Sequence, residues 1–333
     1  MIVAEMSGNH NGSLEKAIKI IQAAARAGAD AIKLQTYTAD TLTLNCCKPE
    51  FMTNPTGLWA GRTAYSLYEE AHTPWEWHEE LFRVAREEGL VCFSSPFDRT
   101  AVDFLESLGN PIYKIASPEI TDIPLIEYAS SKGKPLVFSS GIATREDLEL
   151  AIGTARAAGC NDITLLKCTT AYPTPLQECN LAMIPVFART LGVKAGLSDH
   201  TLGSLAPVIA VSLGATMVEK HFIIDRSEGG PDSSFSMDAG EFAAMVREIR
   251  MVEEALGNDS FEPSRSSIIG RRDARSLYIA KPVRRGDVLT EENLRSVRPG
   301  FGLHPKYYRD CLGKKVDRNL EVGEPFKLEY ILP

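Results

Sequence analysis

The sequence predicts an α/β fold, a (β/α)8 TIM barrel followed by a small C-terminal domain. Up to residue 257, short β-rich runs alternate with longer segments of helical period, and eight such pairs can be counted. The chain has 333 residues, more than one hydrophobic core usually fills, so a second domain is expected. We expect the barrel at residues 1–257, a linker at 258–273 and the second domain at 274–333.

The predicted strands are short runs rich in Val, Ile, Leu and Phe. Strands of a parallel barrel are covered on both faces, so they read as nearly continuous apolar runs. Eight of them, each followed by a helix, close into a barrel. The runs lie at residues 2–7, 31–37, 91–96, 112–117, 135–141, 163–169, 194–199 and 217–222.

The predicted helices between these strands repeat apolar residues three or four positions apart. Several begin after Ser, Thr or Asp and end at Gly, which are helix start and stop signals. Gly28 and Gly159 stand at helix-to-strand turns, where a left-handed residue is expected. The helical segments are residues 14–29, 75–89, 101–108, 125–132, 145–158, 181–191, 205–213 and 241–256.

Residues 38–73 break this rhythm, because they are too long for an ordinary connection after a strand. The segment is rich in proline and aromatic residues. A long loop on the carboxyl-end side of a barrel usually covers the active site, and we expect this one to do so. Residues 274–333 carry short strands and turns, and a module this small is marginal alone, so it is expected to lean on a barrel.

Composition excludes several classes of protein. The net charge of −8 argues against a nucleic-acid or membrane-surface partner, either of which requires a basic face. No apolar run reaches about eighteen residues and no signal peptide is visible, so a cytoplasmic protein is expected. The 7 cysteines form an odd set without a CxxC pair, which indicates reduced, mostly buried thiols.

The predicted strand ends are unusually polar. Lysines inside buried strands require either a partner or a function, and Lys33 and Lys114 are the clearest cases. One alternative is that each lysine only pairs with a carboxylate inside the barrel. Several lysines and serines on one rim instead favour a site for phosphate and carboxylate groups. That rim includes Ser95, Ser117, Ser139 and Ser198.

His200 and His221 lie at the ends of adjacent predicted strands, where two imidazoles can share one metal ion and leave positions for water and substrate. The alternative is a pair of structural histidines. The carboxylates Asp199 and Glu219 stand beside them and can orient the rings. His10 is a third candidate, equally plausible as a packing residue.

Further signals narrow the chemistry. No GxGxxG, GxxxxGK[ST], HExxH or GxSxG motif stands where it could act, which removes the usual support for nucleotide-binding, zinc-protease and serine-hydrolase functions. In the loop "SEGGPDSSFS" after the last predicted strand, Asp232 is suited to bind sugar hydroxyls, unless the loop is a plain connection.

Many ordered blocks of this sequence resemble the sialic acid synthase family, which joins a phosphoenolpyruvate-binding barrel to an antifreeze-like (SAF, β-clip) domain. Within that family the chain is most similar to the pseudaminate-forming branch, rather than to the neuraminate or legionaminate branches. The blocks are "AEMSGNHNGSLEKA", "GADAIKLQTY", "FSSPFD", "YKIASPEITD", "SSGIAT", "LLKCTTAYPTP", "GLSDHTLG", "EKHFIIDRSEGGPDSSFS" and "VRPGFGLHP", and for the branch "GLWAGRTAYSLYEEAHTPWEWH" and "RPGFGLHPKYY".

The resemblance implies a metal-dependent condensation of phosphoenolpyruvate with an acetamido-sugar, 2,4-diacetamido-2,4,6-trideoxy-L-altrose, to give pseudaminic acid and phosphate. It implies His200 and His221 as ligands of a divalent metal, Mn²⁺ with Mg²⁺ or Co²⁺ as alternatives, and Glu5 and Glu119 at the reacting centre. The implied phosphoenolpyruvate contacts are Lys33, Ser95, Lys114, Ser117, Ser139 and Ser198, and the sugar contacts are Tyr172 and Asp232.

Arg298 of "RPG" is similar to an arginine that the SAF domain of a second subunit inserts over the active site, which implies a domain-swapped homodimer. Two features depart from the family pattern. Thr170 replaces an asparagine of the neuraminate enzymes, which suggests a different sugar substituent, and the sequence begins at the first strand without the usual N-terminal hairpin.

Two rival functions belong to other classes. A metal-dependent aldolase or isomerase on the same barrel would release no phosphate. An ice-binding or carbohydrate-binding role for the C-terminal module is disfavoured, because "KPVRRGD" and "RPGFGLHPKYYRD" are too charged for a flat ice-binding face.

Overall fold

The computed structural model describes residues 1–333 and separates into two compact units, Met1–Gly257 and Asn258–Pro333. In the first unit, eight parallel strands follow one another in chain order, and β1 pairs with β8 to close the ring. This confirms the predicted barrel. The strands are β1 Ile2–Glu5, β2 Ala31–Thr36, β3 Val91–Pro96, β4 Tyr113–Ile115, β5 Leu136–Ser139, β6 Ile163–Cys168, β7 Lys194–Asp199 and β8 Val218–Ile223.

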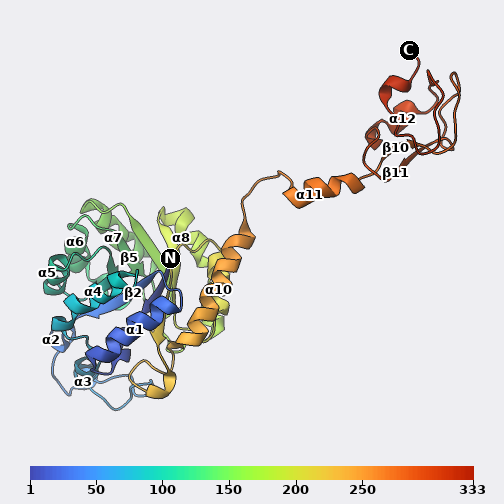
Figure 1. The fold of residues 1–333 in the computed structure, drawn as a ribbon. Coiled ribbons are helices and arrows are strands. Elements are labelled where there is room, and N and C mark those ends of the chain that lie inside the picture. The colour runs from blue at the N-terminus through green and yellow to red at the C-terminus, as the bar shows by residue number, and fades with distance from the viewer. The chain divides into compact units, whose positions relative to one another are not determined.

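Helices surround the strands (Figure 1). Side-chain caps fix where several of them start: Ser13 accepts a hydrogen bond from the backbone N–H of Lys16, and Thr144 forms a reciprocal capping box with Asp147. The main helices are α1 Leu14–Arg26, α4 His78–Glu87, α5 Arg99–Ser107, α6 Ile123–Ser130, α7 Arg145–Ala157, α8 Met183–Leu191, α9 Leu205–Ser212 and α10 Ala239–Leu256.

The helix-to-strand turns contain the glycines expected there. Gly28 has φ +87° and Gly159 has φ +96°, a left-handed conformation that residues with a Cβ rarely adopt. Short 3₁₀ turns complete the barrel connections: η1 Ser7–His10, η3 Trp75–Trp77, η4 Pro118–Thr121, η5 Leu176–Glu178 and η6 Arg226–Glu228.

The barrel interior is layered. Side chains of a strand alternate between its two faces, so residues two apart on one strand share the interior. One layer is an apolar cluster made of Val3, Ala31, Phe93, Val137, Leu166 and Met217. Two residues further along β1 and β2 stand Glu5 and Lys33, which are directly paired in the strand register. The interior therefore changes from apolar to charged toward the carboxyl ends of the strands.

Two parts of the first unit differ from the predicted outline. The segment 38–73 was predicted as a loop but contains α2 Ala39–Leu42, η2 Pro49–Phe51 and α3 Ala64–Ala71. The prediction missed them because helices of one or two turns leave little periodic signal. A ninth strand, β9 Met237–Asp238, pairs with β8, and two residues are too few to show alternation.

The second unit has its own apolar core around Leu277, Leu294 and Phe326. Its antiparallel pair is β10 Ser276–Ile279 with β11 Leu294–Val297. The other elements are α11 Arg265–Gly270, η7 Arg271–Asp273, η8 Pro305–Tyr307, α12 Tyr308–Cys311 and η9 Leu328–Tyr330. Residues 258–275 are exposed throughout.

Two further observations concern the helices and the cysteines. None of the helices has the length and apolar character that a bilayer crossing requires. All the cysteines are free, and five of them are buried, namely Cys92, Cys160, Cys168, Cys179 and Cys311.

Gly196 on β7 provides a test of the barrel packing. A Cβ at this position would lie 2.4 Å from the carbonyl oxygen of Met217 and 2.6 Å from Cδ2 of Leu166. We expect Gly196→Ala to lower the free energy of unfolding by about 1–3 kcal/mol, measured by urea unfolding. Gly153→Ala in α7 is the matched control, since its Cβ would meet nothing within 4 Å and should stabilise by up to about 1 kcal/mol. An unchanged urea midpoint for Gly196→Ala would contradict this packing.

Candidate active site

A cavity of about 580 Å³ lies at the carboxyl ends of the barrel strands. Strand-end residues such as Glu5, Lys33 and His221 line its inner part. The segment 38–73 contributes Leu42, Met52, Thr53, Asn54, Trp59, Ala64, Leu67, Tyr68 and Ala71. The long segment therefore borders the cavity, as its position in the sequence predicts.

Four buried charged side chains form a cluster at the inner end of the cavity, which we call the charge cluster: Glu5, Lys33, Lys114 and Glu219. The Nζ atom of Lys33 lies 2.7 Å from Oε1 of Glu219 and 3.0 Å from Oε2 of Glu5. The Nζ atom of Lys114 donates to both carboxylate oxygens of Glu219, at 2.6 and 2.8 Å. None of the four residues is more than 3% exposed. Each buried charge thus has a partner of opposite sign.

The pKa values within the charge cluster follow from this pairing. Burial by itself raises the pKa of Glu219, but the adjacent ammonium groups of Lys114 and Lys33 lower it further than burial raises it. Glu5 behaves in the same way: burial raises its pKa, Lys33 and then His221 lower it, and the net pKa is well below the usual range. Both carboxylates are therefore ionised at neutral pH.

The pKa values of the two lysines are shifted in opposite directions. Burial lowers the pKa of Lys33, but Glu219 and Glu5 raise it above its ordinary value. Burial lowers the pKa of Lys114. The charge of Glu219 raises this pKa and the charge of Lys33 lowers it, and the net pKa is below its ordinary value. Both lysines pair with carboxylates, which is one of the two alternatives considered from the sequence. Both also line the cavity. An ammonium group carries more donor hydrogens than these contacts use, so both can still bind an anion.

Serine hydroxyls stand next to these lysines. The hydroxyl of Ser198 donates to Oε1 of Glu219 at 3.3 Å, and that of Ser117 accepts from the backbone N–H of Gly141 at 3.1 Å. The Oγ of Ser139 is buried without a hydrogen-bond partner. A buried, unpartnered hydroxyl at a cavity wall is free to bind a ligand oxygen.

His200 and His221 also border the cavity, with ring centroids 5.3 Å apart. The Nδ1 of His200 lies 2.9 Å from the carbonyl oxygen of Thr169, so it donates its hydrogen there and leaves the Nε2 lone pair unused. The Nε2 of His221 lies 3.4 Å from Oε2 of Glu5, and its Nδ1 is buried without a partner. Burial lowers the pKa of His221, which favours the neutral ring.

This histidine pair fits a divalent metal. Each ring has one nitrogen oriented by a protein oxygen and the other left without a partner, the usual arrangement for a metal-binding imidazole. No group of three or more His, Cys, Asp or Glu side chains is placed to hold a metal, so water and substrate would supply the remaining ligands. His10 lies outside the cavity: its Nε2 contacts Thr73 and its ring packs on Trp77.

Glu119 is a carboxyl group of this cavity whose pKa is shifted in the opposite direction from that of Glu5. It lies in η4 directly after β4, it lines the cavity, and its Oε2 is buried without a hydrogen-bond partner. Burial, with a smaller contribution from the charge of Asp122, raises the pKa of Glu119 to about 7. Unlike Glu5, it can gain and lose a proton near neutral pH.

Aromatic residues cover the histidine side of the cavity. The ring of Tyr172 lies 4.4 Å from that of His200, and the ring of Phe235 lies 4.9 Å from that of His221. Asp232 also lines the cavity, but its Oδ2 accepts hydrogen bonds from Ser7 Oγ at 2.5 Å and from the backbone N–H of Gly8 at 3.3 Å.

Comparisons with known proteins agree with this geometry. A model of the NeuB family matches residues 20–261 of the chain, and a model of the SAF domain matches residues 274–330. The chain belongs to the NeuB family. The resemblance found in the sequence blocks is thereby confirmed.

The chain aligns with individual relatives over nearly its whole length. It is 47% identical to the pseudaminic acid synthase of Campylobacter jejuni, over 98% of this chain and 95% of the relative. It is 35% identical to the N,N'-diacetyllegionaminic acid synthase of Legionella pneumophila, over 99% and 94%. The crystal structure of the spore coat polysaccharide biosynthesis protein spsE from Bacillus subtilis superposes with a TM-score of 0.68 at 32% identity, covering 100% of this chain and 95% of that one.

The structure brings together all the sequence-predicted site residues except Ser95 and Arg298. Ser95 lies on β3 opposite Gln35 in the strand register, with its Oγ buried and unpartnered, but it does not line the cavity. Arg298 follows β11 in the second unit. Gln35, a polar residue two positions after Lys33 on the same predicted strand, also lines the cavity. The predicted site residues do not include Tyr37, Tyr68, Phe97, Cys168 and Phe235, which line it as well.

The charge cluster predicts a large effect on stability. Glu219→Ala would leave two buried ammonium groups short of a counter-charge, so we expect the free energy of unfolding to fall by about 3–5 kcal/mol. The control is Asp162→Ala, which breaks the exposed Lys194–Asp162 ion pair and should leave stability nearly unchanged. Urea unfolding measures both, and equal midpoints for the two variants would show that the charge cluster is not held as described.

Proposed function

We propose that this NeuB-family protein condenses phosphoenolpyruvate with 2,4-diacetamido-2,4,6-trideoxy-L-altrose and water to give pseudaminic acid and phosphate. The observation that supports it most is a cavity in which lysines and serines stand beside two metal-competent histidines and a carboxyl group that titrates near neutrality. The identity of 47% to a pseudaminic acid synthase, against 35% to a legionaminic acid synthase, favours the altrose-configured sugar.

The anionic groups of phosphoenolpyruvate would bind at the inner end of the cavity. Lys33 and Lys114 supply ammonium donors, and hydroxyl groups surround them. The serines assigned to this role are Ser95, Ser117, Ser139 and Ser198, of which Ser95 would have to act from just outside the cavity lining. Tyr172 and Asp232 are assigned to the sugar.

His200 and His221 would hold the divalent ion, Mn²⁺ in the first instance, with Mg²⁺ or Co²⁺ as alternatives. Such an ion acts as a Lewis acid that polarises the aldehyde oxygen of the open-chain sugar. The backbone carbonyl of Thr169 and the carboxylate of Glu5 orient the two rings.

The carboxyl groups divide the proton chemistry. Carbon 3 of the enol forms a bond to the aldehyde carbon, and Glu119, protonated below about pH 7, gives its proton to the aldehyde oxygen. Carbon 2 then carries positive charge, which the ionised Glu5 stabilises. Water adds to carbon 2 and loses a proton to the carboxylate of Glu119. Phosphate finally leaves by cleavage of its bond to carbon 2, taking the remaining hydroxyl proton as the ketone forms.

We further propose that the protein is a homodimer in which the SAF domain of one subunit, joined through the linker at 258–273, brings Arg298 to the active site of the other. Its guanidinium would then cover the anionic ligand. This fits the absence of any arginine from the residues that line the cavity.

Phosphate release tests the proposed reaction. Phosphoenolpyruvate and Mn²⁺ are supplied with the altrose-configured sugar, with N-acetylmannosamine or with the legionaminate precursor in parallel, and a chelator is added to a fourth arm. We expect release only with the first sugar, and none with the chelator present. Release only with another sugar would keep the mechanism and change the substrate. A bond-forming or isomerising reaction without phosphate release would support the aldolase or isomerase function instead.

Glu119 predicts a pH dependence. Its proton is needed for the condensation, so kcat/KM should fall as the pH rises through about 7. Glu119→Gln should lower kcat by about 10²–10⁴ and abolish this limb. Asp122→Asn keeps a capping side chain on α6 and removes a neighbouring negative charge, so the limb should move to lower pH. An unchanged limb in Glu119→Gln would assign it to another group.

A further inference from the structure

We infer that the segment 38–73 makes the protein selective for sugars that end in a methyl group at carbon 6, with Trp59 as the central specificity-determining residue. This inference rests on the proposed function, because it concerns how the same cavity chooses its sugar. The long segment has no part in the proposed chemistry at the strand ends, and selection of the sugar would be its role.

Trp59 fixes the segment against the rest of the cavity wall. Its Nε1 donates to the carbonyl oxygen of Pro231 at 2.8 Å, which joins the segment to the loop after β8. Its ring lies 5.8 Å from that of Tyr172 and 6.5 Å from that of Phe235. In Figure 1 the light-blue segment and the yellow loop lie side by side below the barrel. Trp59 therefore presents carbon to the cavity while its only polar atom is occupied.

Two polar groups close to Trp59 in the sequence also have partners within the segment. The hydroxyl of Thr53 donates to the carbonyl oxygen of Trp59 at 2.6 Å. The amide oxygen of Asn54 accepts from the backbone N–H and the hydroxyl of Thr56, both at 3.0 Å. The remaining wall residues of the segment are Leu42, Met52, Ala64, Leu67 and Ala71, which are apolar, and Tyr68, whose hydroxyl is influenced by the charge of Glu119.

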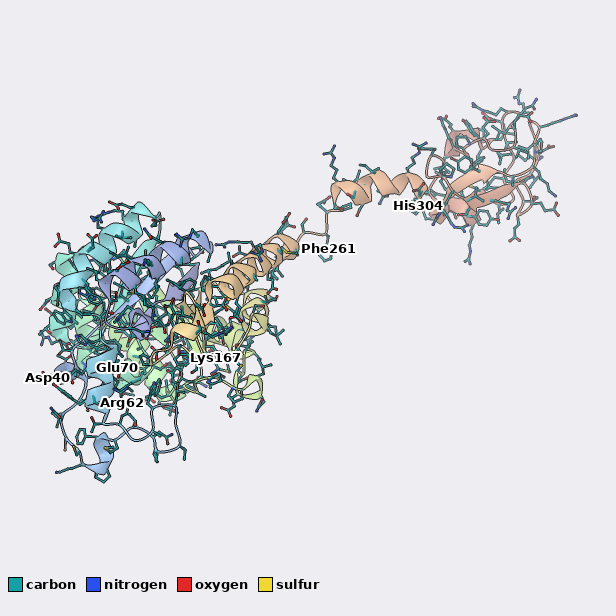
Figure 2. All side chains as sticks on the ribbon, turned by 60° about the horizontal axis from the view of Figure 1, so that its bottom comes forward. Asp40, Arg62, Glu70, Lys167, Phe261 and His304 are labelled. Carbon is teal, nitrogen blue, oxygen red and sulfur yellow. The ribbon has the colours of Figure 1, made fainter.

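The charged residues of the segment do not line the cavity. Arg62 forms an ion pair with Glu70 at 2.6 Å, and Asp40 accepts a hydrogen bond from the hydroxyl of Tyr65 at 3.1 Å. Figure 2 shows Asp40, Arg62 and Glu70 on one side of the first unit. The segment thus keeps its charged side chains off the cavity wall and offers the ligand a mainly apolar surface around Trp59.

The orientation of the sugar follows from the reaction. The aldehyde carbon must lie at the histidines, where it meets phosphoenolpyruvate, so the opposite end of the open chain, carbon 6, extends away from them. Tyr172 contacts both the ring of His200 and that of Trp59, so the apolar wall begins beside the histidines and continues outward. A methyl group can be buried against the ring of Trp59, whereas a hydroxyl placed there would lose its hydrogen bonds to water and gain none from the indole, whose N–H is already donated to Pro231.

The test uses two sugars that differ only at carbon 6: 2,4-diacetamido-2,4,6-trideoxy-L-altrose and the same sugar with a hydroxyl at carbon 6. The ratio of their kcat/KM values is measured by phosphate release. We expect the wild-type protein to favour the methyl form about tenfold to a hundredfold. Trp59→Ala should reduce this ratio to a fewfold, while Trp59→Phe retains most of it and the KM for phosphoenolpyruvate stays unchanged.

Two further variants complete the design. Leu58→Ala changes a neighbouring exposed residue that does not line the cavity and should keep the wild-type ratio. Met52→Ser places a hydroxyl on the wall without removing Trp59 and should narrow the ratio even if Trp59→Ala does not fold. Equal use of both sugars by the wild type, or a full wild-type ratio in folded Trp59→Ala, would overturn the inference. No phosphate release with either sugar would instead overturn the proposed function, and the inference with it.

Discussion

The buried carboxylate of Glu219 is the interaction on which the active site depends. Two ammonium groups can stay charged inside the barrel only because Glu219 contacts both of them and Glu5 contacts one. Buried ion pairs of this kind add little to stability compared with apolar residues of similar size, because desolvation offsets the attraction. Their presence in the barrel interior is therefore better explained by a charged ligand than by the needs of folding. Parallel strand register then determines the geometry, since Glu5 is paired with Lys33 on one side and His221 on the other.

The cavity combines two chemical environments built by different parts of the chain. Its inner end comes from strand ends, which are held by the barrel and keep charges at fixed separations. Its outer wall comes from the segment 38–73 and the loop after β8, joined by the hydrogen bond between Trp59 and Pro231. In such barrels the rigid strands commonly carry the reacting groups, and the connecting segments determine which substrate binds. In this chain it separates anion binding and proton transfer from recognition of the sugar.

The sequence allows much of this architecture to be predicted, for physical reasons that differ between residues. The barrel followed from eight apolar runs, and Lys33 and Lys114 stood out because lysines are rare in buried strands. The contact of both lysines with one carboxylate could not be predicted, because it depends on how strands β2, β4 and β8 meet across the closed barrel. The contact between Trp59 and Pro231 joins segments far apart in sequence, and no local pattern indicates it. Ser95 is an instructive case, since period two places it correctly inside the barrel but does not tell whether it reaches the cavity.

The affinity for phosphoenolpyruvate without sugar tests the central claim most directly, that the charge cluster is an anion site. Titration calorimetry would compare the wild-type protein with Lys114→Met, and with Lys194→Met as a control in an exposed ion pair. The dissociation constant of Lys114→Met should rise by at least about thirtyfold, because the ligand loses a buried, charged donor. The control should bind as the wild type does. Wild-type affinity in a folded Lys114→Met protein would contradict the account, since the buried lysines would then serve the barrel alone.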